Sequence, residues 1–264
     1  MAGAREYLLA ETEADTESVR LGLVERIYDE TTFRRLDALG IAAGARCLEV
    51  GAGRGSVARW LSAGVGADGH VVATDLDCRF LTGLAANVEV RTLDIRDAEL
   101  EPASYDLVHC RALLMHLTDP AAALRTMVAA LRPGGLLLVE EADYGLLTYG
   151  GHPDAAWATA TAHRLFAALA SAKRMNAYLG RALPGLLADA GLEFAGAEVD
   201  SGVARFGEPS FELQRLTVAG AGPSLVAAGL LTDDDRARSR EVLDCPTTVL
   251  TTASLVAAWG RRPR

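Results

Sequence analysis

The sequence lacks the features of membrane-spanning, exported and nucleic-acid-binding proteins. Its apolar runs are short, such as residues 136–139, whereas a membrane-spanning helix needs about 20 apolar residues in succession. Acidic residues, and not an apolar secretion signal, follow the first residues. Cations are few, since 26 Lys and Arg stand against 35 Asp and Glu, and they form a dense cluster only at residues 261–264. A nucleic-acid-binding surface needs clustered cations. We therefore expect a cytoplasmic protein that binds neither nucleic acid nor a membrane.

Metal-binding patterns are also missing. The four cysteines, Cys47, Cys78, Cys110 and Cys245, lie far apart, form no CxxC pair and have no histidine at metal-ligand spacing. Three of them lie in or beside apolar runs, where a cysteine is typically a small buried hydrophobic residue. We therefore expect buried thiols and no metal site.

What the sequence does contain is a regular alternation of strand-like and helix-like segments. Short apolar runs predict five strands, at residues 46–50, 70–74, 88–92, 105–110 and 136–140. Helical patterns lie between them, at residues 56–63, 77–86 and 121–131. This order is typical of a parallel sheet with helices on both faces, and the nearly continuous apolar strands indicate burial on both sides. We expect an α/β fold.

Further elements are predicted on both sides of this core. Apolar residues within 17–39 recur at mostly helical spacing, which predicts one helix, or two with a break near 29–31, ended by Gly40. Beyond Glu141 we expect two helices, at 153–173 and 181–190, further helical material, and two strands, at 193–206 and 252–259. No internal repeat or linker interrupts the chain, so a single domain with a helical insertion is favoured.

The loop Gly51-Ala52-Gly53-Arg54-Gly55 follows the first predicted strand and precedes a helix. Glycines at such a bend let the backbone adopt positive φ and let a ligand approach the main chain closely. A dinucleotide-binding loop needs the spacing GxGxxG, but here Ser56 is in the sixth position. Glu49, two residues before the first glycine, would repel a pyrophosphate and attract an ammonium group. The loop therefore fits a ligand that carries a cationic amino group and no phosphate.

This loop resembles the first motif of the class I S-adenosylmethionine-dependent methyltransferases, an acidic residue followed by GxGxG. Three later features extend the resemblance over residues 47–141: an acid after the second strand, an acid after the third, and the turn Pro133-Gly134-Gly135 before the fifth. The resemblance implies a Rossmann-like methyltransferase fold, which is a doubly wound, seven-stranded, mostly parallel sheet. It also implies S-adenosylmethionine as the cofactor.

The resemblance assigns residues to that cofactor. The methionine part would be bound by Glu49 and the backbone of Gly51, Ala52, Gly53 and Gly55. Asp75, with Leu76 beside it, would accept hydrogen bonds from both ribose hydroxyls, and Asp77 is better placed than Asp75 to cap the next helix. The adenine would meet the Asp94 carboxylate and the Ile95 N–H, and the plain alternative for Asp94 is a loop aspartate. The sulfonium and ribose would pass close to His109 and Arg111, mostly to their backbone.

Less specifically, Tyr7-Leu8-Leu9-Ala10 and Arg20-Leu21 resemble the start of the bacterial small-molecule branch of this family, whose N-terminal segment folds as a lid over the cofactor. This implies cofactor contacts for Tyr7 and Arg20, and the alternative is a surface helix with ordinary charges. We therefore expect a helical lid at residues 1–40 and a methyltransferase domain at residues 41–264, with helical insertions near 144–180 and 208–244.

Methyl transfer from a sulfonium is an in-line displacement, so the protein mainly has to align the reactants and exclude water. A general base is needed only for a protonated, weakly acidic acceptor. His116 is the candidate for that role, although a histidine among apolar neighbours is often structural. Four residues in the expected insertion are candidate acceptor contacts or, equally, part of an aromatic core: Tyr144, Tyr149, His152 and Trp157.

The acceptor itself is constrained by two missing motifs. After the fourth strand there is neither the Asn/Asp-Pro-Pro-aromatic motif of nucleobase amine methylation nor the acid-rich metal set of catechol methyltransferases. We therefore expect metal-independent methylation of oxygen, nitrogen or carbon in a small, specialised metabolite. One alternative is a protein that binds the cofactor without methylating, such as a pericyclase-like catalyst. Another is an NAD(P)-dependent oxidoreductase, which the loop spacing and the lack of a Lys four residues after Tyr178 disfavour. The oligomeric state is not predicted.

Overall fold

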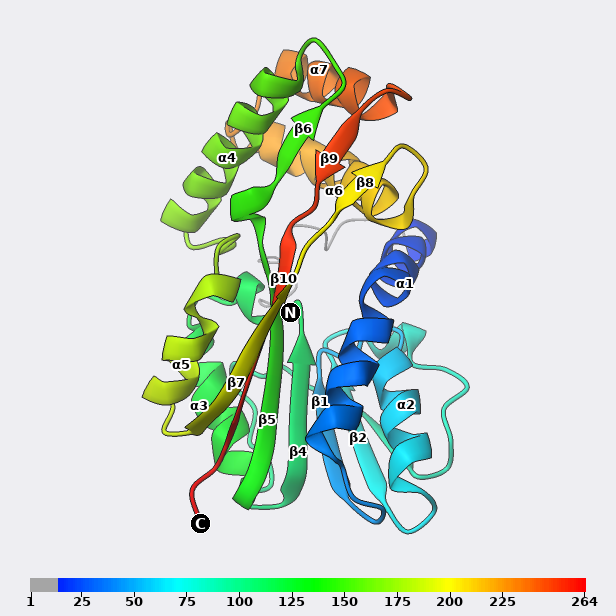
Figure 1. The fold of residues 1–264 in the computed structure, drawn as a ribbon, viewed down its shortest axis with the longest axis vertical. Helices are drawn as coiled ribbons and strands as arrows, with labels where there is room; N and C mark the ends of the chain where they lie inside the picture. The colour runs from blue at the N-terminus through cyan, green and yellow to red at the C-terminus, as the bar shows by residue number, and fades with distance from the viewer. Residues whose placement is uncertain (1–13) are drawn as a thin grey trace.

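The structure is a computed structural model that describes residues 14–264. A seven-stranded sheet with the strand order β3-β2-β1-β4-β5-β10-β7 forms its centre (Figure 1). Its strands are β1 (Arg46–Val50), β2 (His70–Asp75), β3 (Val88–Thr92), β4 (Tyr105–Arg111), β5 (Leu131–Asp143), β7 (Glu193–Asp200) and β10 (Ser254–Arg261). The first five strands pair in parallel, whereas β10 is antiparallel to β5 and β7. The doubly wound, seven-stranded, mostly parallel sheet expected from the sequence is confirmed.

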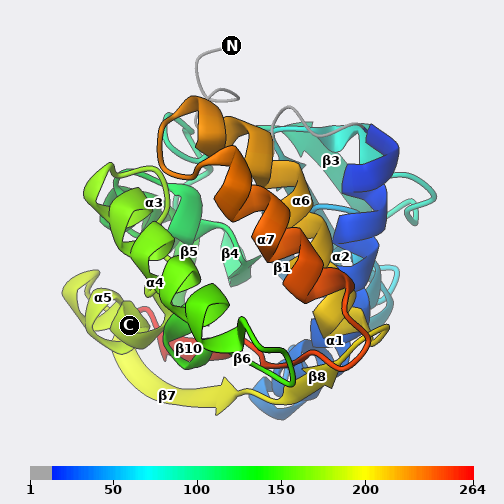
Figure 2. The ribbon, with the colours of Figure 1, turned by 90° about the horizontal axis from the view of Figure 1, so that it is seen from above.

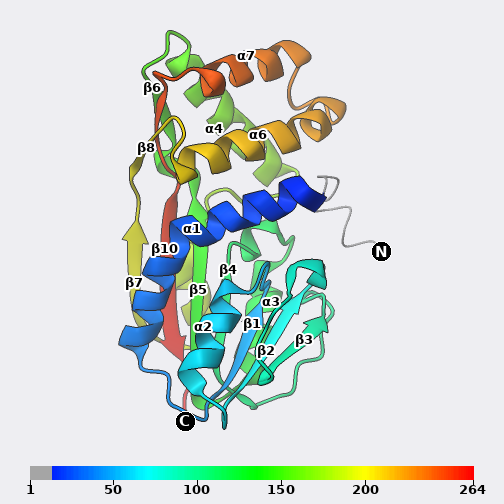
Figure 3. The same ribbon diagram turned by 90° about the vertical axis from the view of Figure 1, so that its right-hand side faces the viewer.

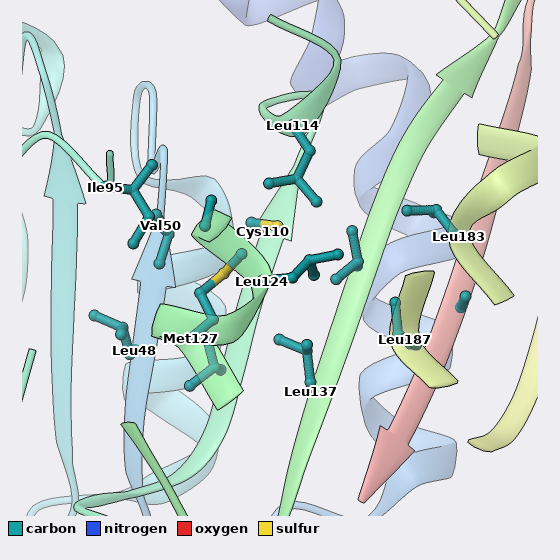
Figure 4. Packing of buried hydrophobic residues seen from close by; sticks show 14 of the residues in the cluster. Leu48, Val50, Ile95, Cys110, Leu114, Leu124, Met127, Leu137, Leu183 and Leu187 are labelled. Atoms are coloured by element: carbon teal, nitrogen blue, oxygen red, sulfur yellow. The ribbon is translucent and has the colours of Figure 1, made fainter. Parts of the chain in front are cut away.

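Apolar side chains bind helices to both faces of this sheet. The helices are α1 (Ala14–Leu39), α2 (Ser56–Val65), α3 (Pro120–Ala130) and α5 (Leu183–Asp189). Because consecutive strand residues point to opposite faces, Cys47 packs with α2 and the C-terminal half of α1, and Leu48 with the cluster under α3 and α5. Figure 4 shows this second cluster, in which Leu124 and Leu187 lie on opposite sides of Leu137.

A cap lies above the carboxyl ends of the parallel strands (Figures 1 and 2). It consists of three helices, α4 (Ala155–Ser171), α6 (Pro209–Ala227) and α7 (Asp233–Asp244), and a small antiparallel sheet of β6 (Thr148–Gly150), β9 (Val249–Thr251) and β8 (Val203–Arg205). A separate apolar cluster that includes Phe166 and Phe211 holds these elements together. Among the helices of residues 14–264, none combines the length and apolar character needed to cross a bilayer.

The N-terminal helix is one continuous element. α1 passes through residues 29–31 without a break and ends before Gly40, whose φ of +71° is in the left-handed region that favours glycine. Its C-terminal half packs into the core, where Phe33 stacks on Trp60 of α2 with the ring centroids 5.3 Å apart. Figure 3 shows α1 running from this packed end toward the cap. The boundary between a lid and a domain at residue 40 stays a prediction.

Two predicted elements are wrong. Residues 77–86 form only a short 3₁₀ turn, Cys78–Phe80, in place of the expected helix: the backbone leaves helical angles at Leu81, whose ψ is +72°, and Gly83 then adopts a φ of +65°. The strand expected at 193–206 is divided into β7 and β8, which belong to different sheets. The cap strands β6 and β9 were not expected at all, and three residues are too few for a periodic signal.

Candidate active site

A cavity of about 500 Å³ lies between the carboxyl edge of the sheet, α1 and the cap. This edge includes the gap between the loops that follow β1 and β4, the point where open α/β sheets bind ligands. The cavity brings together most of the residues predicted for cofactor or acceptor, namely Arg20, Glu49, Gly51, Ala52, Gly53, Asp75, Leu76, Asp94, Ile95, Arg111, His116, Tyr144 and Tyr149. Tyr7 lies outside the described residues.

The glycine loop after β1 is held against the end of β2. The N–H groups of Gly51 and Ala52 donate hydrogen bonds to the Thr74 carbonyl, with N···O distances of 2.8 and 2.9 Å. Gly53 has a φ of +56°, which favours glycine, and its N–H donates to Asp75 Oδ2 at 2.8 Å. Gly55 does not line the cavity; it lies where a Cβ would meet Leu81 at 3.0 Å. Gly51 and Gly53 therefore expose their main chain to the cavity.

Asp75 ends β2 with its carboxylate fixed by backbone. Its Oδ1 accepts from the Asp77 N–H at 3.0 Å and its Oδ2 from the Gly53 N–H. Burial raises the Asp75 pKa, against the opposing effect of these backbone hydrogen bonds. Each carboxylate oxygen can accept a second hydrogen bond, so a vicinal diol still fits. Asp77 caps the 3₁₀ turn at Cys78–Phe80, as expected, by accepting from the Arg79 N–H.

Asp94 follows β3 and pairs with a neighbouring arginine. The Arg96 guanidinium donates to both carboxylate oxygens of Asp94, at 2.9 Å from Nε to Oδ1 and 2.6 Å from Nη2 to Oδ2. This pairing lowers the Asp94 pKa, so the side chain is a carboxylate at neutral pH. An amine donor in the cavity would share this carboxylate with Arg96.

Whether the cavity fits the ammonium group of the cofactor depends above all on Glu49. The side chain is buried, and its Oε1 lies 3.6 Å from His109 Nδ1. Its Oε2 is buried and has no hydrogen-bond partner within residues 14–264. Buried polar atoms in proteins nearly always have a partner. Because Glu49 lines the cavity beside a main-chain loop, its carboxylate is suited to a donor from a ligand. The residues present therefore fit the aminoacyl part of S-adenosylmethionine.

His109 does not line the cavity but lies behind Glu49. Its ring is fully buried between two carboxylates, with Nε2 at 3.4 Å from Glu140 Oε2 on β5. Burial alone would lower the His109 pKa, but the hydrogen bond to Glu140 and the nearby Glu49 carboxylate raise it to about 9. The imidazole is therefore charged at neutral pH and stabilises both carboxylates.

Glu140 connects this group to α1. Its Oε1 accepts from Arg35 Nη1 and its Oε2 from the Thr32 hydroxyl, both at 2.6 Å. Although burial acts in the opposite direction, the hydrogen bond to His109 lowers the Glu140 pKa to about 2. Arg35 pairs in addition with Glu198 and Asp200 on β7. These residues were not among those predicted from the sequence, although an acid inside an apolar strand and an arginine on an apolar helix face could have indicated them.

The side chain of Arg111 also binds α1, where only a backbone role was expected. Its Nη1 donates to the Thr32 hydroxyl at 2.9 Å and its Nη2 to Asp29 Oδ1 at 2.8 Å. The same Asp29 oxygen accepts from the Ser56 hydroxyl at 2.9 Å. Arg20, nearer the N-terminal end of α1, pairs with Glu17 through two short hydrogen bonds. The Arg20–Glu17 pair lies within α1, whereas the contacts of Arg111 and Ser56 fix the helix along one wall of the cavity.

His116 ends a 3₁₀ turn, Leu114–His116, that follows β4. The buried Glu141 carboxylate holds this turn by accepting from the backbone N–H groups of Leu113 at 2.9 Å and Leu114 at 2.6 Å. Burial, with a smaller effect from Arg20, lowers the His116 pKa to about 4. The ring is therefore neutral at pH 7 and can accept a proton, although it is a weak base.

Two of the four predicted acceptor contacts line the cavity and two do not. Tyr144 packs on Phe166 with the ring centroids 4.8 Å apart, and the Tyr149 hydroxyl accepts from Gln214 Nε2 at 2.9 Å. Outside the lining, the His152 ring accepts from the Asp154 N–H, and Trp157 lies under the Arg238 guanidinium. Tyr28 on α1, which the sequence did not indicate, lines the cavity, and burial raises its pKa above the ordinary value.

The cysteines and acids of the described chain do not gather into a metal site. Within residues 14–264 no group of three or more His, Cys, Asp and Glu side chains is arranged to hold a metal ion. All four cysteines are free thiols, of which Cys47 and Cys110 are buried. Metal independence of the reaction stays a prediction.

The fold and the site together define a class of protein. A doubly wound seven-stranded sheet, with an acid and a GxGxG loop at β1 and acids after β2 and β3, is the arrangement of the class I S-adenosylmethionine-dependent methyltransferases. Residues 24–195 match the model of a family described as "Methyltransferase domain". The chain belongs to this family, and the resemblance stated from the sequence is confirmed.

Similar proteins agree in fold and in part of the sequence. The ubiquinone/menaquinone biosynthesis C-methyltransferase UbiE of Idiomarina loihiensis is 29% identical over 127 residues, 45% of this chain and 49% of that protein. The chain spans about half the length of the curated relatives it matches. Phosphoethanolamine N-methyltransferase 2 of Haemonchus contortus shares the fold with a TM-score of 0.59 and 16% identity, covering 97% of this chain and 60% of that one. The [4+2]-cyclase SpnF does so with a TM-score of 0.50 and 16% identity, covering 88% and 80%.

Proposed function

We propose that the protein binds S-adenosylmethionine and transfers its methyl group to an oxygen, nitrogen or carbon atom of a small molecule. The observation that supports this most directly is the Glu49 carboxylate, which belongs to a residue of the cavity lining beside a glycine loop and whose buried Oε2 lacks a hydrogen-bond partner within residues 14–264. An ammonium group would supply the missing donor, whereas a pyrophosphate would be repelled. Membership of the methyltransferase domain family supports the same cofactor.

When bound, S-adenosylmethionine supplies a methyl group attached to a positively charged sulfur. The residues of this chain bind and orient it: Glu49 holds the ammonium group, Asp75 accepts from the ribose hydroxyls, and Asp94 and Ile95 meet the adenine. Arg20 on α1 lines the same cavity. Since α1 and the cap also contribute to the lining, they exclude water from the reacting atoms, which methyl transfer requires.

We propose that the acceptor is a specialised metabolite that binds between the sheet edge and the cap. Tyr28, Tyr144 and Tyr149 offer aromatic rings and hydroxyls to it, and all three line the cavity. His116, which is neutral at pH 7, accepts a hydrogen bond or a proton from the acceptor. A base is required only where the acceptor is weakly acidic, so the main contribution of these residues is alignment.

An alternative function is that the protein binds the cofactor without methylating. The fold also occurs in a [4+2]-cyclase, which favours considering this function. Incubation with methyl-labelled S-adenosylmethionine and a panel of neutral phenols, amines and enols separates the two functions. Transfer of the label to any acceptor supports methylation. Tight cofactor binding without transfer to any member of the panel favours the alternative.

Cofactor binding itself is tested at Asp75. Asp75→Asn keeps the shape of the side chain and removes the charge, so we expect the affinity for S-adenosylhomocysteine to fall about 10- to 150-fold through loss of charge-assisted hydrogen bonds. Isothermal titration calorimetry measures this change. The matched control is Asp68→Asn, at an exposed position of the same domain away from the cavity, which should leave the affinity unchanged. Equal affinities in wild type and Asp75→Asn would contradict the ribose assignment.

A further inference from the structure

The charge of the cavity lining changes abruptly from one end to the other. We call the part lined by residues 142–255 the cap end. None of the described lining residues of the cap end carries a formal charge. They are apolar or aromatic apart from a few hydroxyls and one amide, such as Thr217 and Ser239 on α6 and α7, and Gln214. All the charged lining residues lie between positions 17 and 111 of the chain, the part that we call the opposite end. One of them, Arg20 on α1, is close enough to Tyr144 of the cap end to oppose the effect of burial on the Tyr144 pKa.

The arginines of that opposite end are already paired with acids. Each of the five has a carboxylate partner in the structure: Arg20 with Glu17, Arg54 with Glu25, Arg79 with Asp77, Arg96 with Asp94, and Arg111 with Asp29. The two acids of the lining that are not in these pairs, Glu49 and Asp75, face the proposed cofactor. An anionic acceptor therefore meets no cation from the residues of the cap end, and it competes with an existing ion pair at Arg20 and at the other arginines of the lining.

We infer that the acceptor is a neutral and largely apolar molecule with hydrogen-bonding groups at only a few points. Moving an ion from water into such a site without a partner is strongly unfavourable, whereas apolar surface is favourably buried against leucine, valine and phenylalanine. This inference rests on the proposed function and specifies the substrate class of the same site.

One polar pair at the cap end indicates where such a molecule carries a polar group. Because the Tyr149 hydroxyl accepts a hydrogen bond from Gln214 Nε2, its own proton is available to donate. Burial raises the Tyr149 pKa to about 12, which keeps the phenol protonated. A carbonyl, ether or hydroxyl oxygen on the acceptor is the matching group.

This substrate class differs from that of a protein with the same fold. The structure of the Haemonchus contortus enzyme is a complex with phosphomonomethylethanolamine, whose phosphate needs cationic or N–H partners. The described cap end of this chain provides no cation. A shared fold therefore does not carry the acceptor with it.

A set of probes with one shape and three charges tests the inference. At pH 7 and with saturating S-adenosylhomocysteine, calorimetry compares 2-naphthol, 2-naphthoate and 2-naphthylmethylammonium. We expect 2-naphthol to bind at least 10-fold more tightly than either ion. Equal or tighter binding of an ion, or no binding of 2-naphthol, overturns the inference and leaves the proposed function standing if S-adenosylhomocysteine still binds. Failure of S-adenosylhomocysteine to bind overturns both.

Matched variants locate the binding of the probes. Thr217→Arg adds a cation to the cap end, whereas Ala219→Arg adds it to an exposed position two residues further along α6. We expect Thr217→Arg to weaken 2-naphthol and strengthen 2-naphthoate binding by at least 10-fold each, and Ala219→Arg to change neither. Equal behaviour of the two variants would show that the probes bind elsewhere. If Thr217→Arg does not fold, Ser239→Arg and exposed Ala237→Arg on α7 form an equivalent pair.

Discussion

At the scale of single residues, the structure explains why a charged histidine lies in the centre of the fold. Two carboxylates in the core, Glu49 and Glu140, would destabilise the protein if they faced each other without a cation. His109 lies between them, at 3.6 Å from one and 3.4 Å from the other. It therefore acts as a positioning residue, because it holds Glu49 in place without contacting the cavity.

The stability of the protein should consequently depend on this proton. The His109 pKa is raised from 6.5 to about 9 in the folded state, so its contribution to the free energy of unfolding is complete below pH 6.5 and is lost as the pH rises through about 9. His109→Gln should lower the free energy of unfolding at pH 7 by about 3–5 kcal/mol and remove this pH dependence. Urea unfolding between pH 6 and 9.5 measures both effects.

The control for this prediction is His70→Gln. His70 is a half-exposed histidine that forms a surface ion pair with Glu89, and such pairs contribute about 0–1 kcal/mol. A His109→Gln variant as stable as His70→Gln at pH 7 would show that the buried imidazole is not charged in the folded protein.

At the scale of elements, α1 is fixed to the α/β core by two neighbouring groups of polar contacts, which Arg111 connects by donating to both Thr32 and Asp29. Its C-terminal half is bound through Thr32 and Arg35 to Glu140. Further toward its N-terminus, Asp29 accepts from Arg111 on β4 and Ser56 at the start of α2. Because Ser56 directly follows the glycine loop, the second attachment links the helix to the cofactor loop.

Breaking the second attachment should therefore loosen one half of the helix. Asp29→Asn removes a charge-assisted pair worth about 1.5–3 kcal/mol, so we expect faster hydrogen exchange in residues 15–30 and at least 5-fold weaker binding of S-adenosylhomocysteine. Hydrogen exchange near Arg35 should stay unchanged. Hydrogen-exchange mass spectrometry and calorimetry measure the two effects. The exposed neighbour Glu30 provides the control as Glu30→Gln. Identical exchange in both variants would mean that Asp29 does not hold α1.

The elements that the sequence predicted correctly are those with a strong local signal. Strands buried on both faces are nearly continuous apolar runs, so β1, β2, β4 and β5 were found. The edge strand β3 was also found, but it is largely exposed, and the burial on both sides expected for every strand is wrong there. The helix expected at 77–86 was wrong because the backbone leaves helical angles at Leu81 and again at Gly83, which the apolar pattern does not indicate. For the candidate site, the motif residues are brought to one cavity, but the roles of Arg35 and Glu140 depend on a pairing across more than 100 positions. Such a long-range pairing produces no periodic pattern in the sequence that could predict it.

At the scale of the whole molecule, the cavity joins parts of the chain that are far apart, since α1, the glycine loop and the cap all line it. A ligand that binds the folded state alone raises stability by mass action, by about 2.7 kcal/mol at a concentration of 100 times Kd. For a chain of this size we expect S-adenosylhomocysteine at that concentration to raise the Tm by about 5–10 °C.

The same experiment discriminates between the two cofactors that glycine loops bind. NADH should not raise the Tm, because the Glu49 carboxylate beside the loop repels a pyrophosphate and because the spacing departs from GxGxxG. Glu49→Gln sharpens the comparison: it removes the charge, so the shift with S-adenosylhomocysteine should shrink while NADH still produces none. Differential scanning fluorimetry with both ligands on both proteins provides the measurement. A rise in Tm with NADH and none with S-adenosylhomocysteine would mean that the loop holds a pyrophosphate, and the cavity would then belong to a redox enzyme.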